Sequence, residues 1–269
     1  MAKTQNLPRI AAVMAAHNAD KTLIQAVESL LIDKVPIDVY IVDDASKKPV
    51  TQLFDKVPEY VYVLRQENNV GAAKARNIAL KEILVRGYEY VAVMDSDDIA
   101  LPGRIRNTIA FLDANPKVAA VGGWAHCVDE DTLETLYDHR HPGDNVTIKA
   151  RMNIDARFVH STVTFRSAAL KSQGFYDENY PIAQDYEIMM RLAKKYELAN
   201  LPEFLLLYRI SKNGISVHKM YRQRVARLRI QLQHFRFIKP LAWYGLCRSF
   251  LRVAVPNNFV VFLKKVRGV

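Results

Sequence analysis

The chain has little cysteine, no glycine-rich phosphate loop near its amino end and no uninterrupted apolar run long enough to cross a bilayer. Its two cysteines, Cys127 and Cys247, match neither a metal nor a redox spacing, which indicates a reducing compartment. The missing G-x-G-x-x-G segment disfavours a dinucleotide-dependent oxidoreductase. Arg248 and Arg252 interrupt the longest apolar stretch, so we expect no transmembrane helix. Residues 1–8 are short and polar, so we expect no secretory signal.

Acidic residues are absent from the last part of the chain. No Asp or Glu follows Glu203, whereas Lys and Arg recur to the end, and the formal net charge is +10. This uneven distribution indicates an anionic partner surface for the carboxyl end. The 269 residues, 50% of them hydrophobic, suffice for one large α/β domain with a filled core and an appendage.

The most informative stretch runs from Tyr90 to Asp98. An apolar, β-branched segment is followed by Asp95, Asp97 and Asp98, which is typical of a buried parallel strand with carboxylates at its carboxyl end. Ligands of open α/β sheets bind at that edge. Crowded carboxylates repel one another unless a cation or hydrogen-bond donors neutralise them, and Mg2+ or Mn2+ carrying a diphosphate fits that need. The alternative for Asp98 alone is a cap of the next helix.

Apolar strands and helical patterns alternate in the first half of the chain. Strands are predicted at residues 10–15, 37–42, 60–64 and 90–94, with helices after the first and third. This order predicts a parallel sheet with right-handed crossovers, on which the polar strand ends converge in one crevice. The later elements are predicted as helices 102–115, 145–152 and one from residue 184, strands 118–124, 161–166 and 204–210, and a hairpin or excursion over 131–143.

Residues 217–269 form a separate, basic tail. Its apolar residues recur at helical spacing from Tyr221 to Phe235, with arginines at other positions. A basic, aromatic-rich amphipathic tail suits an anionic membrane surface. Packing on the domain and homodimer formation remain open, and nucleic acid is disfavoured because no recognised binding motif accompanies the charge.

Five motifs in order carry a specific resemblance. They are Ala15-Ala16-His17-Asn18, Asp43-Asp44-Ala45-Ser46, Asn69-x-Gly71 with Arg76-Asn77, Asp95-Ser96-Asp97-Asp98, and Gln184-Asp185. Together they resemble an inverting family 2 glycosyltransferase of GT-A fold over residues 8–216. The resemblance implies an α/β fold with a Rossmann-like, mostly parallel central sheet flanked by helices, followed by the basic amphipathic helical extension. Within 1–216 we expect a nucleotide-binding half, 1–98, and an acceptor half, 99–216.

The resemblance also implies a UDP-sugar donor and Mn2+ or Mg2+ as cofactor. Asp44 would accept a hydrogen bond from the uracil ring, as an acceptor-only carboxylate can. Asp43, in contrast, is expected to fix the loop that follows the strand at 37–42. Ala15, His17 and Asn18 would line the base pocket, where His17 stacks on the base or is a buried, satisfied histidine.

The diphosphate and metal residues follow from the same resemblance. Asp95 and Ser96 would contact the nucleotide sugar, Asp95 through the ribose or a metal-bound water, and Asp97 would be the direct metal ligand. Gly71 permits a backbone conformation that other residues avoid. Arg76, one turn into the following helix, would face the nucleotide or its phosphates.

Asp185 matches the catalytic base of the family. It would take the proton of the acceptor hydroxyl, although an Asp at a helix start is also a common cap. Gln184 stands where the family often has Glu. Trp124 and His160 lie where relatives line the acceptor side, while a core role for Trp124 is equally open. Tyr208, Arg209 and residues 211–216 resemble a loop over the diphosphate. His139 and His141 have no metal spacing and are expected to be surface or loop residues.

The predicted function is transfer of a sugar to a glycan or lipid-linked acceptor by a protein at the cytoplasmic face of the membrane. Two alternatives stay open. A sugar nucleotidyltransferase would need a glycine-rich, basic loop at residues 15–18, which this chain lacks. A non-catalytic membrane-surface protein of the same fold would not need Asp97 and Asp185.

Overall fold

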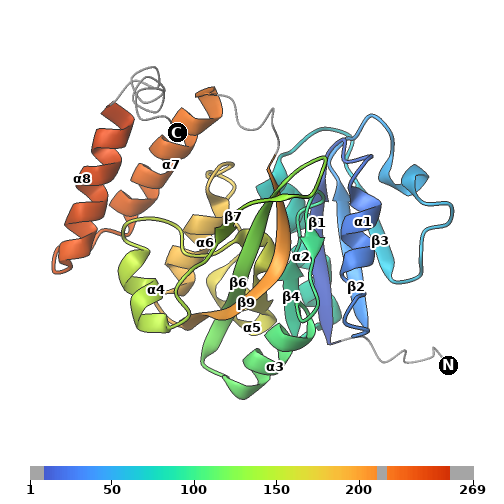
Figure 1. Ribbon diagram of the computed structural model, residues 1–269, viewed down its shortest axis with the longest axis horizontal. Coiled ribbons are helices and arrows are strands. Elements are labelled where there is room, and N and C mark those ends of the chain that lie inside the picture. The colour runs from blue at the N-terminus through green and yellow to red at the C-terminus, as the bar shows by residue number, and fades with distance from the viewer. Residues whose placement is uncertain (1–8, 211–216, 255–269) are drawn as a thin grey trace.

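Four parallel strands form the first half of the central sheet in the computed structural model, which describes residues 9–210 and 217–254 (Figure 1). The strands are β1 (Ile10–Ala16), β2 (Ile37–Asp43), β3 (Val61–Arg65) and β4 (Tyr90–Val93), in the spatial order β3-β2-β1-β4. Helices α1 (Leu23–Ser29) and α2 (Ala72–Arg86) connect them. The predicted parallel arrangement of these strands is confirmed.

The sheet continues as a mixed sheet in the order β4-β8-β6-β9-β5. Strand β8 (Thr164–Arg166) is antiparallel to β4 and to β6 (Val118–Asp129), whereas β9 (Glu197–Ile210) runs parallel to β6. The short β5 (Ile99–Ala100) pairs with β9, and β7 (Thr135–His139) pairs with β6 as a hairpin. The hairpin is one of the two arrangements predicted for residues 131–143.

Three predicted strands have clearly different bounds, of which the one predicted at 118–124 is the first part of the longer β6. The strand predicted at 204–210 is the second half of β9, because Pro202 lies at a register shift between β6 and β9 and breaks the apolar pattern there. Residues 161–166 divide into a 3-10 turn, His160–Thr162, and β8.

Helices cover both faces of the sheet. Buried side chains of α1 and of Ile105 and Leu112, at α3 (Arg106–Ala114), pack on one face. The other face carries α2, α4 (Asn145–Arg151), α5 (Ser167–Gln173) and α6 (Gln184–Leu192). Every residue of β2 and β4 is buried, which explains their apolar sequences, and each buried Val or Ile contributes about 1.5–3 kcal/mol.

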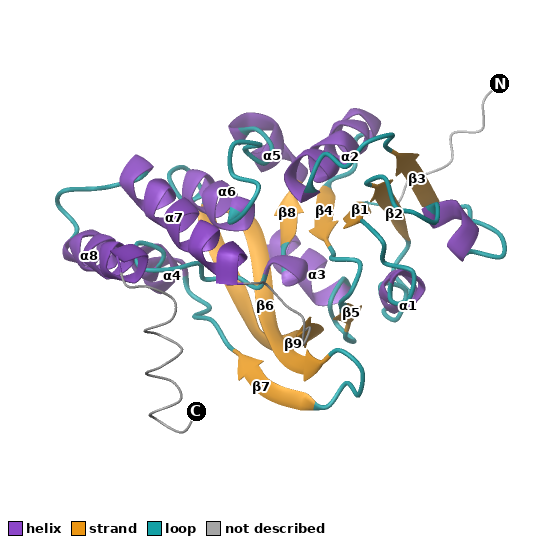
Figure 2. Ribbon diagram, turned by 90° about the horizontal axis from the view of Figure 1, so that it is seen from above, coloured by secondary structure: helices purple, strands orange, loops and turns teal. Residues whose placement is uncertain are grey.

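Helices α7 (Val217–Gln233) and α8 (Pro240–Ala254) form a helical hairpin at the end of the molecule opposite β3 (Figures 1 and 2). Gln231 of α7 donates hydrogen bonds to the carbonyl oxygens of Asn153 (3.2 Å) and Ile154 (3.0 Å). Gly245 of α8 lies so close that an added Cβ would be 2.0 Å from the Asn153 oxygen. The hairpin therefore packs on the domain. Among the described residues, no helix combines the length and apolarity needed to span a bilayer.

Candidate active site

The polar segments that follow β1, β2 and β4 meet at one edge of the sheet, as predicted from their places in the sequence. Ala16 pairs with Asp43 in the register of β1 and β2. His17 Nδ1 lies 2.7 Å from the Asp44 carbonyl oxygen, and the amide of Asn18 donates to Ser46 Oγ at 3.0 Å. The loops after the first two strands are thus held together by their own polar residues.

Asp43 fixes the loop after β2, as the sequence predicted. Its carboxylate is fully buried and accepts hydrogen bonds from the amides of Ser46 (2.9 Å) and Val50 (3.0 Å) and from Arg65. Burial opposes ionisation, but these donors outweigh it and lower the pKa of Asp43. The carboxylate of Asp43 therefore stabilises the loop.

Asp44 holds the start of α2 against the end of β2. Its two carboxylate oxygens accept hydrogen bonds from the amides of Val70 (2.7 Å) and Gly71 (2.9 Å). Gly71 has a φ of +83°, a conformation that L side chains rarely adopt, so the role predicted for its backbone is confirmed. The side chain of Asp44 is buried, whereas His17 and Asn18 are exposed and Ala15 is half-buried.

The residues Asp95, Ser96, Asp97 and Asp98, here named the carboxylate turn, follow β4. Asp98 is 1% exposed; Oδ1 accepts the amide of Arg209 at 3.1 Å, and Oδ2 has no partner among the described residues. Desolvation and the charge of Asp95 raise the pKa of both Asp97 and Asp98. The turn therefore carries more negative charge than its surroundings neutralise, which suits a divalent cation.

The cap alternative for Asp98 is wrong. Helix α3 begins only at Arg106, and its amino end is held by Asp33 from another part of the chain. Asp33 accepts hydrogen bonds from the amides of Gly103 (2.6 Å), Ile105 (2.8 Å) and Arg106 (3.0 Å). Asp98 is left facing β9 and the turn.

Arg76 forms an ion pair with Asp95, so one of the residues expected at the phosphates lies against the carboxylate turn. Arg76 is 4% exposed, and its Nε and Nη1 have no hydrogen-bond partner in the described part of the chain. Burial raises the pKa of Asp95, but Arg76 and then His160 outweigh this effect. The net pKa of Asp95 is lowered, so its carboxylate stays ionised. Nε and Nη1 of Arg76 are therefore buried donors that no described residue satisfies.

A cavity of about 520 Å³ lies beside this ion pair. Five of the predicted site residues line it, coming from α2, the carboxylate turn, the 3-10 turn and α6: Arg76, Asp95, His160, Gln184 and Asp185. Asp185 sits in the first turn of α6, but the N-cap residue is Ala183 and no side chain caps the helix. Asp185 makes no hydrogen bond within residues 9–210 and 217–254, so its carboxylate is available to a ligand.

His160 lines the cavity and interacts electrostatically with two of its carboxylates, Asp95 and Asp185. Its Nε2 is 2.8 Å from the hydroxyl of Tyr176. Burial and then the nearby Arg76 lower the pKa of His160 to about 4, so the imidazole is neutral at pH 7. A neutral imidazole can accept or donate a hydrogen bond here without adding charge.

Arg104 positions both sides of the cavity and was not found from the sequence. It is fully buried and donates to the carbonyl oxygens of Val93 (3.1 Å), Ser161 (3.2 Å) and Val163 (3.0 Å). Val93 ends β4 just before the carboxylate turn, and Ser161 follows His160. Burial lowers the pKa of Arg104 to about 9, which still leaves the guanidinium charged at pH 7.

Some predicted residues lie elsewhere, and some cavity residues were missed. Trp124 is not among the lining residues; it packs edge-to-face on Phe204 and donates to the His141 carbonyl oxygen at 3.0 Å. His141 lies in the loop that follows β7, one of the two settings predicted for it, but it is 8% exposed and lines the cavity. Gln223 and Arg227 of α7 also line the cavity, although the catalytic part was predicted to end at residue 216. Residues 211–216 lie outside the described residues.

No three His, Cys, Asp or Glu side chains converge as a ready-made metal site in the described ranges. This does not conflict with the charge of the carboxylate turn. Mg2+ is commonly held by one or two carboxylates together with substrate phosphates and water. Asp95 and Asp97 are carboxylates of the kind that such a site uses.

Comparison with known proteins gives a consistent result. A family model described as "Glycosyl transferase family 2" matches residues 11–174. The amylovoran biosynthesis glycosyltransferase AmsE of Erwinia amylovora is 26% identical over 265 residues, 93% of this chain and 96% of that protein. An Escherichia coli protein, UDP-Glc:alpha-D-GlcNAc-diphosphoundecaprenol beta-1,3-glucosyltransferase WfaP, is 24% identical over 215 residues, 78% of this chain and 80% of that one.

Solved structures share the fold. Residues 1–349 of S. aureus TarS in complex with UDP-GlcNAc superpose with a TM-score of 0.68 at 19% identity, covering 90% of this chain and 72% of that chain. The mannosyltransferase PcManGT of Pyrobaculum calidifontis, in complex with GDP-Man and Mn2+, has a TM-score of 0.65 at 16% identity, covering 98% and 81%. The α/β architecture predicted from the motifs is confirmed.

Proposed function

The chain belongs to glycosyl transferase family 2 and is a glycosyltransferase, and on this premise we propose that it moves a sugar from a UDP-sugar to a lipid-linked or cell-surface glycan acceptor with inversion at the anomeric carbon. One observation carries the proposal. The unpaired carboxylate of Asp185 lines the same cavity as the Arg76–Asp95 ion pair, next to the carboxylate turn.

The donor is proposed to bind at the strand ends. Ala15, His17 and Asn18 would lie along the base, and Asp44, whose carboxylate is oriented by two backbone amides, would accept from the uracil ring. Each oxygen of a carboxylate has more than one acceptor position, so the two amides do not exhaust Asp44. A UDP-sugar is supported by the UDP-GlcNAc complex of TarS and by the name of WfaP.

The diphosphate is proposed to lie between Arg76 and the carboxylate turn. Asp97 would hold Mn2+ or Mg2+ directly, with Asp95 contacting the ribose or a metal-bound water and Ser96 beside the nucleotide sugar. When bound, the ion would neutralise charge on the departing diphosphate. The two unpartnered N–H groups of Arg76 would donate to the same diphosphate.

The chemical step is a direct displacement. The oxygen of an acceptor hydroxyl forms a bond to the anomeric carbon while the bond from that carbon to the diphosphate oxygen breaks, and UDP leaves with the electron pair. Asp185 takes the proton of the hydroxyl, which makes it the general base. Neutral His160 and Gln184 line the same cavity and are proposed to orient the acceptor.

The helical hairpin is proposed to lie on an anionic membrane at the cytoplasmic face. Phe237 and Ile238, between α7 and α8, are 77% and 96% exposed, and Trp243 is 47% exposed. Next to them is a cavity of about 160 Å³ with four cationic side chains among its lining residues, Lys149, Lys194, Arg236 and Lys239. Apolar side chains beside cationic ones suit the headgroup region of anionic lipids.

A donor screen tests the proposed function. Thermal shift and hydrolysis would be measured with UDP-, GDP-, CMP- and dTDP-sugars in the presence of Mn2+ or Mg2+, with Asp97→Asn as the control. We expect a UDP-sugar to stabilise the wild-type protein and to be hydrolysed slowly by it. Both effects should require the metal and should be absent in Asp97→Asn. Stabilisation without any turnover would favour the non-catalytic alternative, and release of pyrophosphate from UTP and a sugar phosphate would favour the nucleotidyltransferase.

A further inference from the structure

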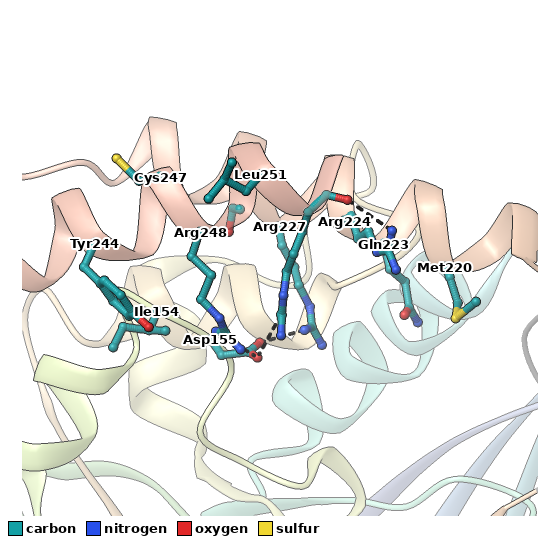
Figure 3. A pocket seen from close by; sticks show the side chains of 12 residues that line it. Ile154, Asp155, Met220, Gln223, Arg224, Arg227, Tyr244, Cys247, Arg248 and Leu251 are labelled. Atoms are coloured by element: carbon teal, nitrogen blue, oxygen red, sulfur yellow. Dashed lines mark hydrogen bonds and ion pairs between the residues drawn. The ribbon is translucent and has the colours of Figure 1, made fainter. Parts of the chain in front are cut away.

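A second cavity, of about 660 Å³, lies between the helical hairpin and residues Ile154 and Asp155 (Figure 3). One carboxylate, Asp155, is the only acidic group among its described lining residues, which include four arginines: Arg224, Arg227, Arg248 and Arg252. We name this space the arginine cavity. Its lining carries a formal excess of positive charge.

Three of the four arginines converge on the single carboxylate, and Arg224 donates to the Arg252 carbonyl oxygen at 3.1 Å. Arg227 Nη1 lies 2.7 Å from Asp155 Oδ1, whereas the nearest atoms of Arg248 and Arg252 are both 3.9 Å from Oδ2. Figure 3 shows Arg227 and Arg248 pointing toward Asp155 from the two helices. One carboxylate cannot neutralise the three guanidinium groups of Arg227, Arg248 and Arg252, and burial together with Arg248 lowers the pKa of Arg252. The cavity is therefore matched to a ligand with more than one negative charge.

The arginine cavity adjoins the active site. Asp155, Gln223 and Arg227 line both this cavity and the active-site cavity of about 520 Å³. Asp185 lines the active-site cavity. The arginine cavity also has apolar walls, formed by Ile154, Met220 and Tyr244, with Leu251 of α8 at its edge. A molecule that fills both spaces would present a sugar to Asp185, negative charge to the arginines and an apolar chain to the hairpin.

We propose that the arginine cavity binds the diphosphate of a lipid-linked acceptor. This inference rests on the proposed function and narrows its acceptor to a saccharide joined to a lipid through a diphosphate. The planar guanidinium groups would hold the phosphate oxygens in bidentate fashion, and the lipid would continue along the exposed apolar side of α8. Arg248 and Arg252 then determine acceptor specificity, because their contacts to Asp155 are long and leave them able to turn to a stronger anion.

The test uses farnesyl diphosphate as a probe, with saturating UDP and Mg2+ present to fill the donor site. The full-length variant Arg248→Gln/Arg252→Gln would be compared with Arg222→Gln/Arg229→Gln, which removes the same charge from exposed positions of α7 outside the cavity. We expect the dissociation constant of the probe to rise at least about tenfold in the first variant and to stay within about twofold in the second. Farnesol, which lacks the diphosphate, should not bind.

A third variant moves the affinity in the opposite direction. Asp155→Asn removes the one competing carboxylate, so it should tighten binding of the probe several-fold, which a merely structural role of Asp155 would not do. Equal weakening in both arginine variants would overturn the proposal, as would an unchanged dissociation constant in Arg248→Gln/Arg252→Gln.

Two further measurements separate the sources of failure. Loss of binding to phosphatidylglycerol vesicles in the cavity variant, with no binding of farnesyl diphosphate to the wild type, would assign the cavity to membrane headgroups and contradict an acceptor site. The thermal shift with UDP is recorded for each variant. If UDP stabilises all of them while the probe fails to bind, the further inference fails and the donor proposal stands; if UDP itself has no effect, the proposed function fails.

Discussion

Arg76 and Asp95 form an ion pair at the end of β4, with Arg76 almost completely buried. The pair joins α2, whose start is held by Asp44 through Gly71, to the carboxylate turn. It leaves two N–H groups of Arg76 without a partner among the described residues. One guanidinium thus holds a carboxylate and keeps unsatisfied donors, which is the basis for proposing that it also binds the diphosphate.

Replacing Arg76 by Lys should weaken nucleotide binding while preserving the fold. The ammonium keeps the charge opposite Asp95 but loses the fork of N–H groups that would reach the diphosphate. We expect the dissociation constant of UDP to rise about tenfold, as measured by calorimetry with Mg2+. The matched change Arg86→Lys, at the exposed end of the same helix, should have no effect. Equal affinity in Arg76→Lys would remove Arg76 from the donor site.

Replacing Arg104 by Met should destabilise the whole domain. The substitution removes the buried donor of the Val93 and Ser161 carbonyl oxygens, at roughly 1 kcal/mol or more for each, whereas the Val163 oxygen still accepts from the Val93 amide. We expect the free energy of unfolding in urea to fall by about 2 kcal/mol or more. Arg106→Met, two residues on and with a largely exposed side chain, is the control and should change it by less than about 1 kcal/mol. A small effect of Arg104→Met would show that the clamp is dispensable.

The parallel half of the sheet could be predicted because its strands are apolar on both faces and end in polar residues. The same regularity brought Asp95 into consideration, whereas His160 and Asp185 were proposed from the resemblance to family 2 glycosyltransferases. Arg104 was not predicted to be a site residue because the sequence places it within a helix predicted from residue 102. Its actual setting depends on Asp33, which caps α3 across a separation of about seventy residues.

The remaining differences also come from long-range packing. The tail was separated from the catalytic part at residue 216 because its composition changes there. Nothing local indicates that Gln231 reaches the loop at Asn153, or that Gly245 permits close contact with the same loop. The positions of Trp124 and His141 could not be predicted for the same reason. The register between β6 and β7 decides which side chains of this hairpin face the cavity.

Stability should fall in mild acid through His234. This residue is 7% exposed, and burial together with Lys194 and Arg191 lowers its pKa to about 4. The unfolded chain takes up a proton below about pH 6.5 whereas the folded one does not, so stability is present above that pH and is lost as the pH falls toward 4. His234→Gln should lessen the decrease between pH 7 and pH 4.5 by about 2 kcal/mol. Parallel urea-denaturation curves for the two proteins would contradict the assignment.

The exposed residues between α7 and α8 should carry membrane binding. Phe237→Ser/Ile238→Ser removes two apolar side chains without touching the arginines, and it should lower the fraction sedimenting with phosphatidylglycerol vesicles several-fold. Val85→Ser/Val146→Ser, at 86% and 78% exposed positions elsewhere, is the control and should sediment like the wild type. Unchanged sedimentation of the first variant would give the hairpin another role, of which a homodimer interface is the predicted alternative.

The most direct test of the account is the replacement of Asp185 by Asn, which keeps the shape of the side chain and removes its basicity. We predict that UDP binds the variant within about twofold of the wild type, while turnover of the UDP-sugar falls about a thousandfold. That combination assigns Asp185 to the chemical step. Turnover near the wild-type rate would contradict its role as the base, and an equal loss of UDP binding would make it a structural residue of α6.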